Sequence, residues 1–151
     1  MKARVTLNEG MQFVGNSESG HAVLLDAAPE VGGTDTALRP MEFLLISLGG
    51  CTGMDVVSIL RKMRVEWERF EILLEAERAP EHPKVFTKIR LTYRIWGDDI
   101  PEDKLKKAIE LSQERYCSVA AMLGKTAEIT YEYRINPEPA ARMQESLRAT
   151  F

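Results

Sequence analysis

The sequence predicts an α+β domain in which antiparallel strands pack on a buried central helix. The segment from Met41 to Leu60 is apolar on every side and contains only two charged residues, Glu42 and Asp55, as a helix covered on all faces does. Segments of alternating polarity precede and follow it, which is typical of strands with one buried face. The predicted order is three strands, a helix, two strands, one or two helices and a strand.

The first strands are expected at residues 3–7, 11–14 and 21–25, where apolar and polar residues alternate or apolar residues run together. Short turns rich in Gly, Asn and Ser join them, which predicts a hairpin followed by a third strand. The next 13 residues, 26–38, show no periodicity. We expect a loop there, long enough to suggest a functional role.

The central helix is expected to begin at Pro40, because proline suits the first helical position. Its end is marked by three basic residues, Arg61, Lys62 and Arg64. Gly49, Gly50 and Gly53 weaken a helix unless another backbone comes close. The same helix of a second subunit, packed across a two-fold axis, is the first candidate for that neighbour. The second helix of the same chain is the alternative.

The rest of the domain is expected to hold strands at 69–77 and 85–96, where apolar and charged residues alternate. Pro101 opens a second helix that delivers Cys117. A short apolar run then ends at Gly124, and the last strand follows at 127–135.

Composition indicates one domain, because 151 residues with 44% hydrophobic side chains form a single core of normal size. We place it at residues 1–136, with 137–151 as a tail that contains a short helix at 140–147. A net charge of −3 favours neither nucleic acid nor an anionic membrane as partner. We expect neither a signal segment nor an apolar run of membrane-spanning length, and so a cytoplasmic protein.

The two cysteines, Cys51 and Cys117, admit two interpretations. Free cysteines are among the most buried residues, so both could be inert core thiols. Alternatively, Cys51 lies among glycines that cannot hide it, and the two thiols could act as a peroxidatic and a resolving cysteine. We expect no metal and no cofactor, because neither the cysteines nor the histidines, His21 and His82, show the paired spacings of zinc sites.

Arg39 and Glu42 flank the start of the central helix. They could be ordinary helix-start residues, with the acid favoured by the helix dipole. They could instead form a site in which the guanidinium stabilises a Cys51 thiolate and the carboxylate holds the guanidinium in place. Nine positions separate Glu42 from Cys51, about 13 Å and half a turn along a straight helix. We therefore expect these residues to meet only across two subunits.

Four short segments occur in this order: Gly33-Thr34, Arg39-Pro-Met-Glu42, Leu48-Gly-Gly-Cys51-Thr52 and, later, Tyr116-Cys117. Together they resemble the OsmC/Ohr family of osmotically induced and organic-hydroperoxide-resistance proteins. The resemblance implies an intertwined homodimer with sites at the interface, and cysteine-based reduction of organic hydroperoxides. It implies that Cys51 is peroxidatic, that Cys117 resolves, and that Glu42 pairs with the activating arginine. A dithiol, such as a lipoylated protein, would be the reductant.

This chain departs from the better-known branches of the family at two places. Their arginine lies upstream of the Gly-Thr loop, near the positions of Leu24 to Ala28 here, where this chain has none, so Arg39 is the candidate. Their second cysteine is commonly followed by proline, and here Ser118 follows it. The rival function is that of a non-enzymatic dimeric protein that binds a small apolar ligand.

Overall fold

The computed structural model describes residues 1–138, in two compact units that are described separately below. The first unit covers Met1–Ser47 and the second begins at Leu48. The helix predicted at 140–147 lies outside the described residues, and the boundaries predicted for the domain and its tail stay a prediction.

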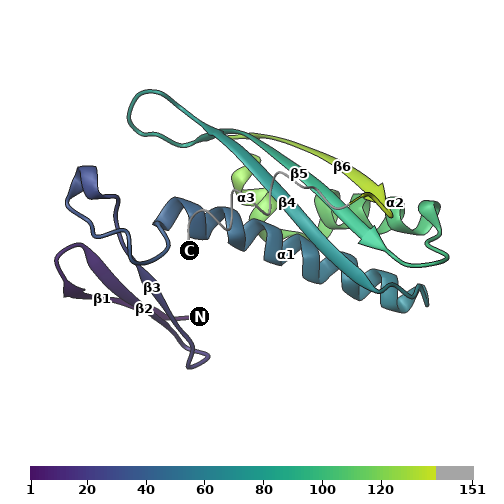
Figure 1. The fold of residues 1–151 in the computed structure, drawn as a ribbon, viewed down its shortest axis with the longest axis horizontal. Helices are drawn as coiled ribbons and strands as arrows, with labels where there is room; N and C mark the ends of the chain where they lie inside the picture. The colour runs from purple at the N-terminus through teal and green to yellow at the C-terminus, as the bar shows by residue number, and fades with distance from the viewer. Residues whose placement is uncertain (139–151) are drawn as a thin grey trace. The chain divides into compact units, whose positions relative to one another are not determined.

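A three-stranded antiparallel sheet in the order β1-β2-β3 forms most of the first unit (Figure 1). Its strands are β1 (Ala3–Glu9), β2 (Gln12–Ser17) and β3 (Ala22–Leu25). The two connections turn at Gly10 and Gly20, whose φ angles of 56° and 85° lie in the left-handed region that glycine adopts most readily. The predicted hairpin and third strand are confirmed.

The loop between β3 and the central helix contains one turn of 3₁₀ helix, η1 (Pro29–Val31), and is organised by Asp26. The Asp26 carboxylate is 2% exposed and accepts five hydrogen bonds, from the Ala27 amide and from the amides and hydroxyls of Thr34 and Thr36. These donors, led by the Thr34 hydroxyl, hold the pKa of Asp26 far below its usual range. A Cβ at Gly33 would overlap the Ala27 carbonyl, so only glycine fits there.

Helix α1 (Pro40–Lys62) begins in the first unit and continues through the second. Its fully buried residues recur at every fourth position and form one stripe, consisting of Leu48, Thr52, Val56 and Leu60. Met54, on another side, is 73% exposed. For residues 1–138 of the single chain, the prediction that the helix is buried on every face is therefore wrong, because part of the helix surface is exposed.

Part of α1 has a mean hydropathy of 1.8, so by length and composition this helix could cross a membrane. The sequence-based expectation that no segment approaches that length was wrong. Its buried stripe and the sheet residues packed against it identify α1 as the core helix of the second unit.

The second sheet has the order β4-β5-β6, and Figure 1 shows helices on one of its faces. Its strands are β4 (Arg69–Arg78), β5 (Phe86–Trp96) and β6 (Glu128–Ile135). Strands β4 and β5 are antiparallel, whereas β5 and β6 are parallel, which corrects the prediction of antiparallel strands throughout. The reason is the helical connection between β5 and β6, because it returns the chain to the end at which β5 began.

That connection consists of α2 (Glu102–Leu111), the π-helical turn η2 (Ser112–Tyr116) and α3 (Ser118–Leu123). Core side chains from β5 face these helices and are fully or almost fully buried: Ile89, Leu91, Tyr93 and Ile95. The buried residues Leu105, Ala108 and Ile109 form the inner face of α2.

The glycines of α1 meet a strand. A Cβ at Gly49 would lie 2.7 Å from Leu74 Cδ1, and one at Gly53 would lie 3.3 Å from Ile72 Cδ1, so both make room for β4. Gly50 faces only the flexible end of Met54. Among the described residues, the element close to Gly49 and Gly53 is therefore β4, and neither of the two helices expected from the sequence. Packing of α1 against a second subunit stays a prediction.

Candidate functional site

The second unit brings Cys51 and Cys117 together. Their Sγ atoms and a carboxylate oxygen of Asp55 all lie within 4.8 Å of one another. Cys51 and Asp55 are four residues apart on α1, so both side chains project from the same face of the helix. Both cysteines are free thiols. Cys51 and Cys117 are 66 positions apart in the sequence, and the helical connection between β5 and β6 brings Cys117 beside α1.

Cys117 reaches this position through the π-helical turn η2. The Cys117 amide donates to the Ser112 carbonyl at 2.8 Å, five residues back instead of the usual four. Cys117 is also the N-cap of α3, and its Sγ accepts a hydrogen bond from the Ala120 amide at 3.4 Å. The predicted second helix is therefore divided into three segments, and Cys117 lies at the junction of the last two.

The two thiols have different surroundings. Cys117 is 2% exposed, whereas Cys51 is half-buried. Burial raises the pKa of Cys117 to about 11, and the neighbouring Cys51 and Asp55 act in the same direction. Cys117 is consequently a neutral thiol at pH 7, and Cys51 is the thiol that solvent can reach.

A chain of buried hydrogen bonds runs beside the dithiol. The Ser112 hydroxyl donates to Asp55 Oδ2 at 3.0 Å, and since it has one hydrogen it must accept from Thr52 Oγ1 at 2.8 Å. Thr52 in turn accepts from the Tyr93 hydroxyl at 2.6 Å, which accepts from Gln113 Nε2 at 2.7 Å. Burial raises the pKa of Tyr93 to about 12, so Tyr93 keeps the proton that it donates.

Every hydroxyl in this chain therefore donates toward Asp55. Gln113 Nε2 also donates to Thr52 Oγ1 at 3.1 Å, so Thr52 takes part in three of these bonds. Hydrogen bonds aligned in one direction polarise one another, and the acceptor at the end gains most. The network thus fixes the position of the Asp55 carboxylate beside the two sulfurs.

Sequence reasoning missed the network and Asp55. The i to i+4 spacing of Cys51 and Asp55 was visible, and it places both side chains on one helix face. Tyr93, Ser112 and Gln113 come from other elements and carried no local signal.

Arg39 and Glu42 belong to the first unit, and the dithiol belongs to the second. The Arg39 guanidinium pairs with Asp35 at 2.8 Å and with Glu42 at 3.8 Å. Glu42 Oε2 also accepts from the Arg39 amide at 3.0 Å, which is half of a capping box at the start of α1. The predicted contact between carboxylate and guanidinium therefore exists, together with the ordinary helix-start role that was its alternative.

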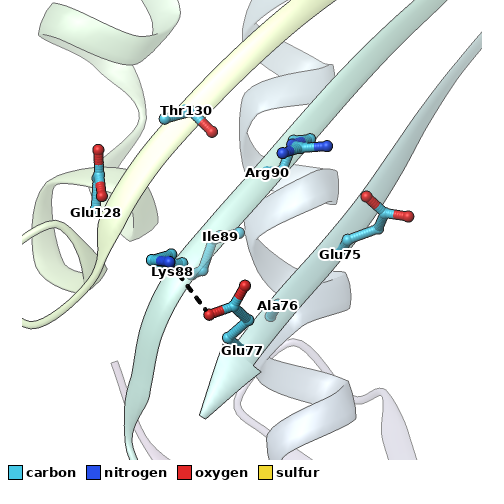
Figure 2. Close-up of a pocket in the computed structure, with 8 residues that line it drawn as sticks. All are labelled: Glu75, Ala76, Glu77, Lys88, Ile89, Arg90, Glu128 and Thr130. Carbon is cyan, nitrogen blue, oxygen red and sulfur yellow. Dashed lines mark ion pairs between the residues drawn. The ribbon is translucent and has the colours of Figure 1, made fainter. Parts of the chain in front are cut away.

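A hollow on the second sheet contains neither cysteine (Figure 2). Its charged and polar lining comes from all three strands: Glu75, Glu77, Lys88, Arg90, Glu128 and Thr130. Figure 2 shows the Lys88 ammonium and the Glu77 carboxylate joined across β5 and β4, 3.5 Å apart. Lys88 and Glu77 thus offset each other's charge in this hollow, which lies apart from the two cysteines.

A long core helix with one cysteine, a helical connection that brings a second cysteine beside it, and two small sheets define an α+β protein with a paired-thiol centre. Residues 33–132 match the OsmC-like protein family, and the chain belongs to that family. The resemblance noted in the sequence is confirmed at this level.

Three relatives show how far the similarity extends. The chain is 43% identical over 135 residues to protein YhfA of Escherichia coli, which covers 89% of this chain and 98% of YhfA. A hypothetical protein from Aquifex aeolicus is 32% identical, with a TM-score of 0.75 over 90% of this chain and 97% of that one. An organic hydroperoxide resistance protein OsmC from Legionella pneumophila, also described as a predicted redox protein, shares the fold at 13% identity, with a TM-score of 0.66 over 87% and 94% of the chains.

Proposed function

We propose that this protein is a thiol-dependent peroxidase that reduces organic hydroperoxides. The observation that carries the proposal is the unequal pair of close thiols: Cys51 is open to solvent, and Cys117 is buried within 4.8 Å of it. A peroxidatic cysteine must meet substrate, whereas a resolving cysteine needs only to reach the first sulfur. Cys51 therefore attacks and Cys117 resolves.

The chemistry has two steps. The Cys51 thiolate attacks the terminal peroxide oxygen, which forms an S–O bond, breaks the O–O bond and, with one proton from solvent, releases the alcohol. The Cys117 sulfur then attacks the sulfenic acid, and the departing hydroxide takes the Cys117 proton and leaves as water. The resulting disulfide is reduced by an external dithiol. Since a disulfide bond is about 2.05 Å long, the sulfurs need to approach by a few ångströms at most.

Support from the relatives is limited to family and fold. The Legionella pneumophila protein is described as an organic hydroperoxide resistance protein, and it shares this fold at low identity. The E. coli relative YhfA is similar over almost its whole length and is named without an activity. The proposal for this chain therefore depends on its own two thiols.

We further propose that the site is completed in a homodimer. Met54 is exposed and Gly50 faces only its flexible end, so the described residues leave this side of α1 uncovered, and a second α1 would cover it. Arg39, held by Asp35 and Glu42, would then stabilise the Cys51 thiolate of the partner subunit. A reduced dithiol also requires a reducing compartment, so the proposal places the protein in the cytoplasm.

A turnover assay with cumene hydroperoxide and dihydrolipoamide tests the function. We expect consumption of one dithiol per hydroperoxide, none with Cys51→Ser, and a single turnover with Cys117→Ser. Hydrogen peroxide should be a poorer substrate. An absence of turnover in reduced wild-type protein with every dithiol tried would refute the proposal and favour the rival, a non-enzymatic ligand-binding protein.

A further inference from the structure

We propose that the reduced protein binds one thiophilic divalent cation, of the Zn²⁺ class, through Cys51, Asp55 and Cys117, with water as the fourth ligand. The site needs only the reduced thiols, so it does not depend on peroxidase activity. No metal was expected from the sequence, because the cysteines and histidines do not show the paired spacings of zinc sites.

The geometry of the three donors fits such an ion. Two thiolate sulfurs and one carboxylate oxygen are an accepted zinc ligand set, with Zn–S near 2.3 Å and Zn–O near 2.0–2.2 Å. In a tetrahedral site these bond lengths place the donor atoms about 3.6–3.8 Å apart. The donor atoms here lie within 4.8 Å of one another, so small side-chain rotations complete the site.

The charge balance also favours a cation. Cys51, Asp55 and Cys117 each become negative on losing a proton, and they share one partly buried space. A divalent ion between these three groups would offset the negative charge that they carry as ligands. Because the thiols release protons on binding, the affinity should rise with pH.

Hydrogen-bond donors hold two of the three proposed ligands in place, as is usual in metal sites. Ligating side chains are normally held by outer hydrogen bonds, whose loss typically lowers the metal affinity by about 10–100-fold. Ser112 donates to Asp55 Oδ2 at 3.0 Å, and the Ala120 amide donates to Cys117 Sγ at 3.4 Å. The polarised chain from Tyr93 and Thr52 fixes Ser112 in turn. Two of the three ligands are thus oriented before any ion arrives.

The donor set selects the kind of metal. Thiolates prefer soft or borderline ions such as Zn²⁺, Cd²⁺ and Co²⁺, whereas Mg²⁺ and Ca²⁺ prefer sites made of oxygen. Cys51 and Asp55 are only half-buried, which gives an ion a route inward and leaves the fourth position to water. Three protein ligands with one open position is the arrangement of zinc sites that exchange a ligand.

Titration of reduced, chelator-treated protein with Co²⁺ under anaerobic conditions tests the site. We expect one equivalent to produce thiolate-to-cobalt charge-transfer absorption together with the visible bands of a tetrahedral ion, and Zn²⁺ to displace it. Cys51→Ser and Cys117→Ser should each remove about half of the charge-transfer intensity. Asp55→Asn, which keeps the side-chain volume, should weaken binding about tenfold or more. Ser112→Ala should weaken it to a smaller extent.

The matched control is Asp99→Asn, an exposed carboxylate in the turn before α2, which should bind Co²⁺ like the wild type. Circular dichroism and the Tm of each metal-free variant establish that it is folded. No charge-transfer band at saturating Co²⁺ would overturn the proposal. So would an unchanged affinity in folded Cys117→Ser or Asp55→Asn protein. Failure of the peroxidase assay would leave these spectra unaffected, so the two proposals can fail separately.

Discussion

Replacement of Thr52 by valine should destabilise the protein strongly although the shape of the side chain hardly changes. Thr52 is fully buried, and its hydroxyl takes part in hydrogen bonds with Tyr93, Ser112 and Gln113. Each such bond contributes about 1 kcal/mol net, and the Tyr93 hydroxyl would be left as a buried donor without an acceptor. We expect Thr52→Val to cost about 3 kcal/mol.

Urea unfolding followed by far-UV circular dichroism measures this cost. For a chain of this length, about 3 kcal/mol corresponds to a Tm lower by about 6–12 °C. Thr52→Ser is the matched control, because it keeps the hydroxyl and loses one methyl group, a cost of about 1 kcal/mol. The valine variant should therefore be the less stable of the two.

A double-mutant cycle with Tyr93→Phe identifies the hydrogen bond itself. The second substitution should cost at least about 1 kcal/mol less in the Thr52→Val background, since the tyrosine hydroxyl has by then lost its acceptor. If Thr52→Val is as stable as Thr52→Ser, or if the two substitutions are additive, the Thr52–Tyr93 hydrogen bond does not stabilise the fold as proposed.

Three further predictions concern other parts of the molecule. Asp26→Asn should destabilise the loop at neutral pH. Because the folded-state pKa of Asp26 lies below its usual value of 3.8, its stabilisation is present above pH 3.8 and is lost as the pH falls further. The variant should therefore show a weaker loss of Tm than the wild type between about pH 4 and pH 2. Equimolar cumene hydroperoxide should remove two hydrogens from the intact mass by joining Cys51 to Cys117; a sulfinic acid at Cys51 beside a free Cys117 would contradict the resolving role. Arg39→Ala should slow iodoacetamide labelling of Cys51 at pH 7 by about tenfold in Cys117→Ser protein, equivalent to about 1.4 kcal/mol of thiolate stabilisation. Glu42→Ala should have a smaller effect. An unchanged labelling rate in Arg39→Ala protein would remove Arg39 from the site.

The elements with strong periodicity could be placed from the sequence almost to the residue. Strand β5 was expected at 85–96 and is Phe86–Trp96, and α1 was expected from Pro40 and begins there. For β5 the alternation of buried and exposed side chains decides the local structure, whereas the start of α1 follows from proline at the first helical position. The loop at 26–38 was also expected, but its organisation by Asp26 depends on contacts eight and ten residues away that no periodicity reports.

Features that depend on a partner element could not be predicted in this way. Alternation in β6 is the same for parallel and antiparallel pairing, so the direction of its contact with β5 was missed. An apolar surface on α1 does not state what covers it. Among the described residues the cover comes from β4, β5 and the helical connection, and it leaves Met54 exposed. Five residues of π-helix cannot be distinguished from α-helix by the spacing of apolar residues, so η2 was not expected.

The residues of the candidate site could likewise be predicted only in part from the sequence. The resemblance singled out Cys51 and Cys117, and the structure brings both together. Asp55 was noted only as one of two charges in an apolar segment, because the templates for metal and catalytic sites do not include a lone Cys-x₃-Asp spacing. Its importance follows only from the arrival of Cys117 on a distant segment.

The π-helical turn η2 makes the site sensitive to how one segment is wound. A homologue of the same length in which this segment continued as a regular α-helix would have its second cysteine rotated by about 100° around the helix axis. Such a protein would keep both cysteines and lose their proximity. Within the family, loss of this turn at constant length would therefore separate proteins that can form the disulfide from proteins that cannot, and counting cysteines alone would group them together.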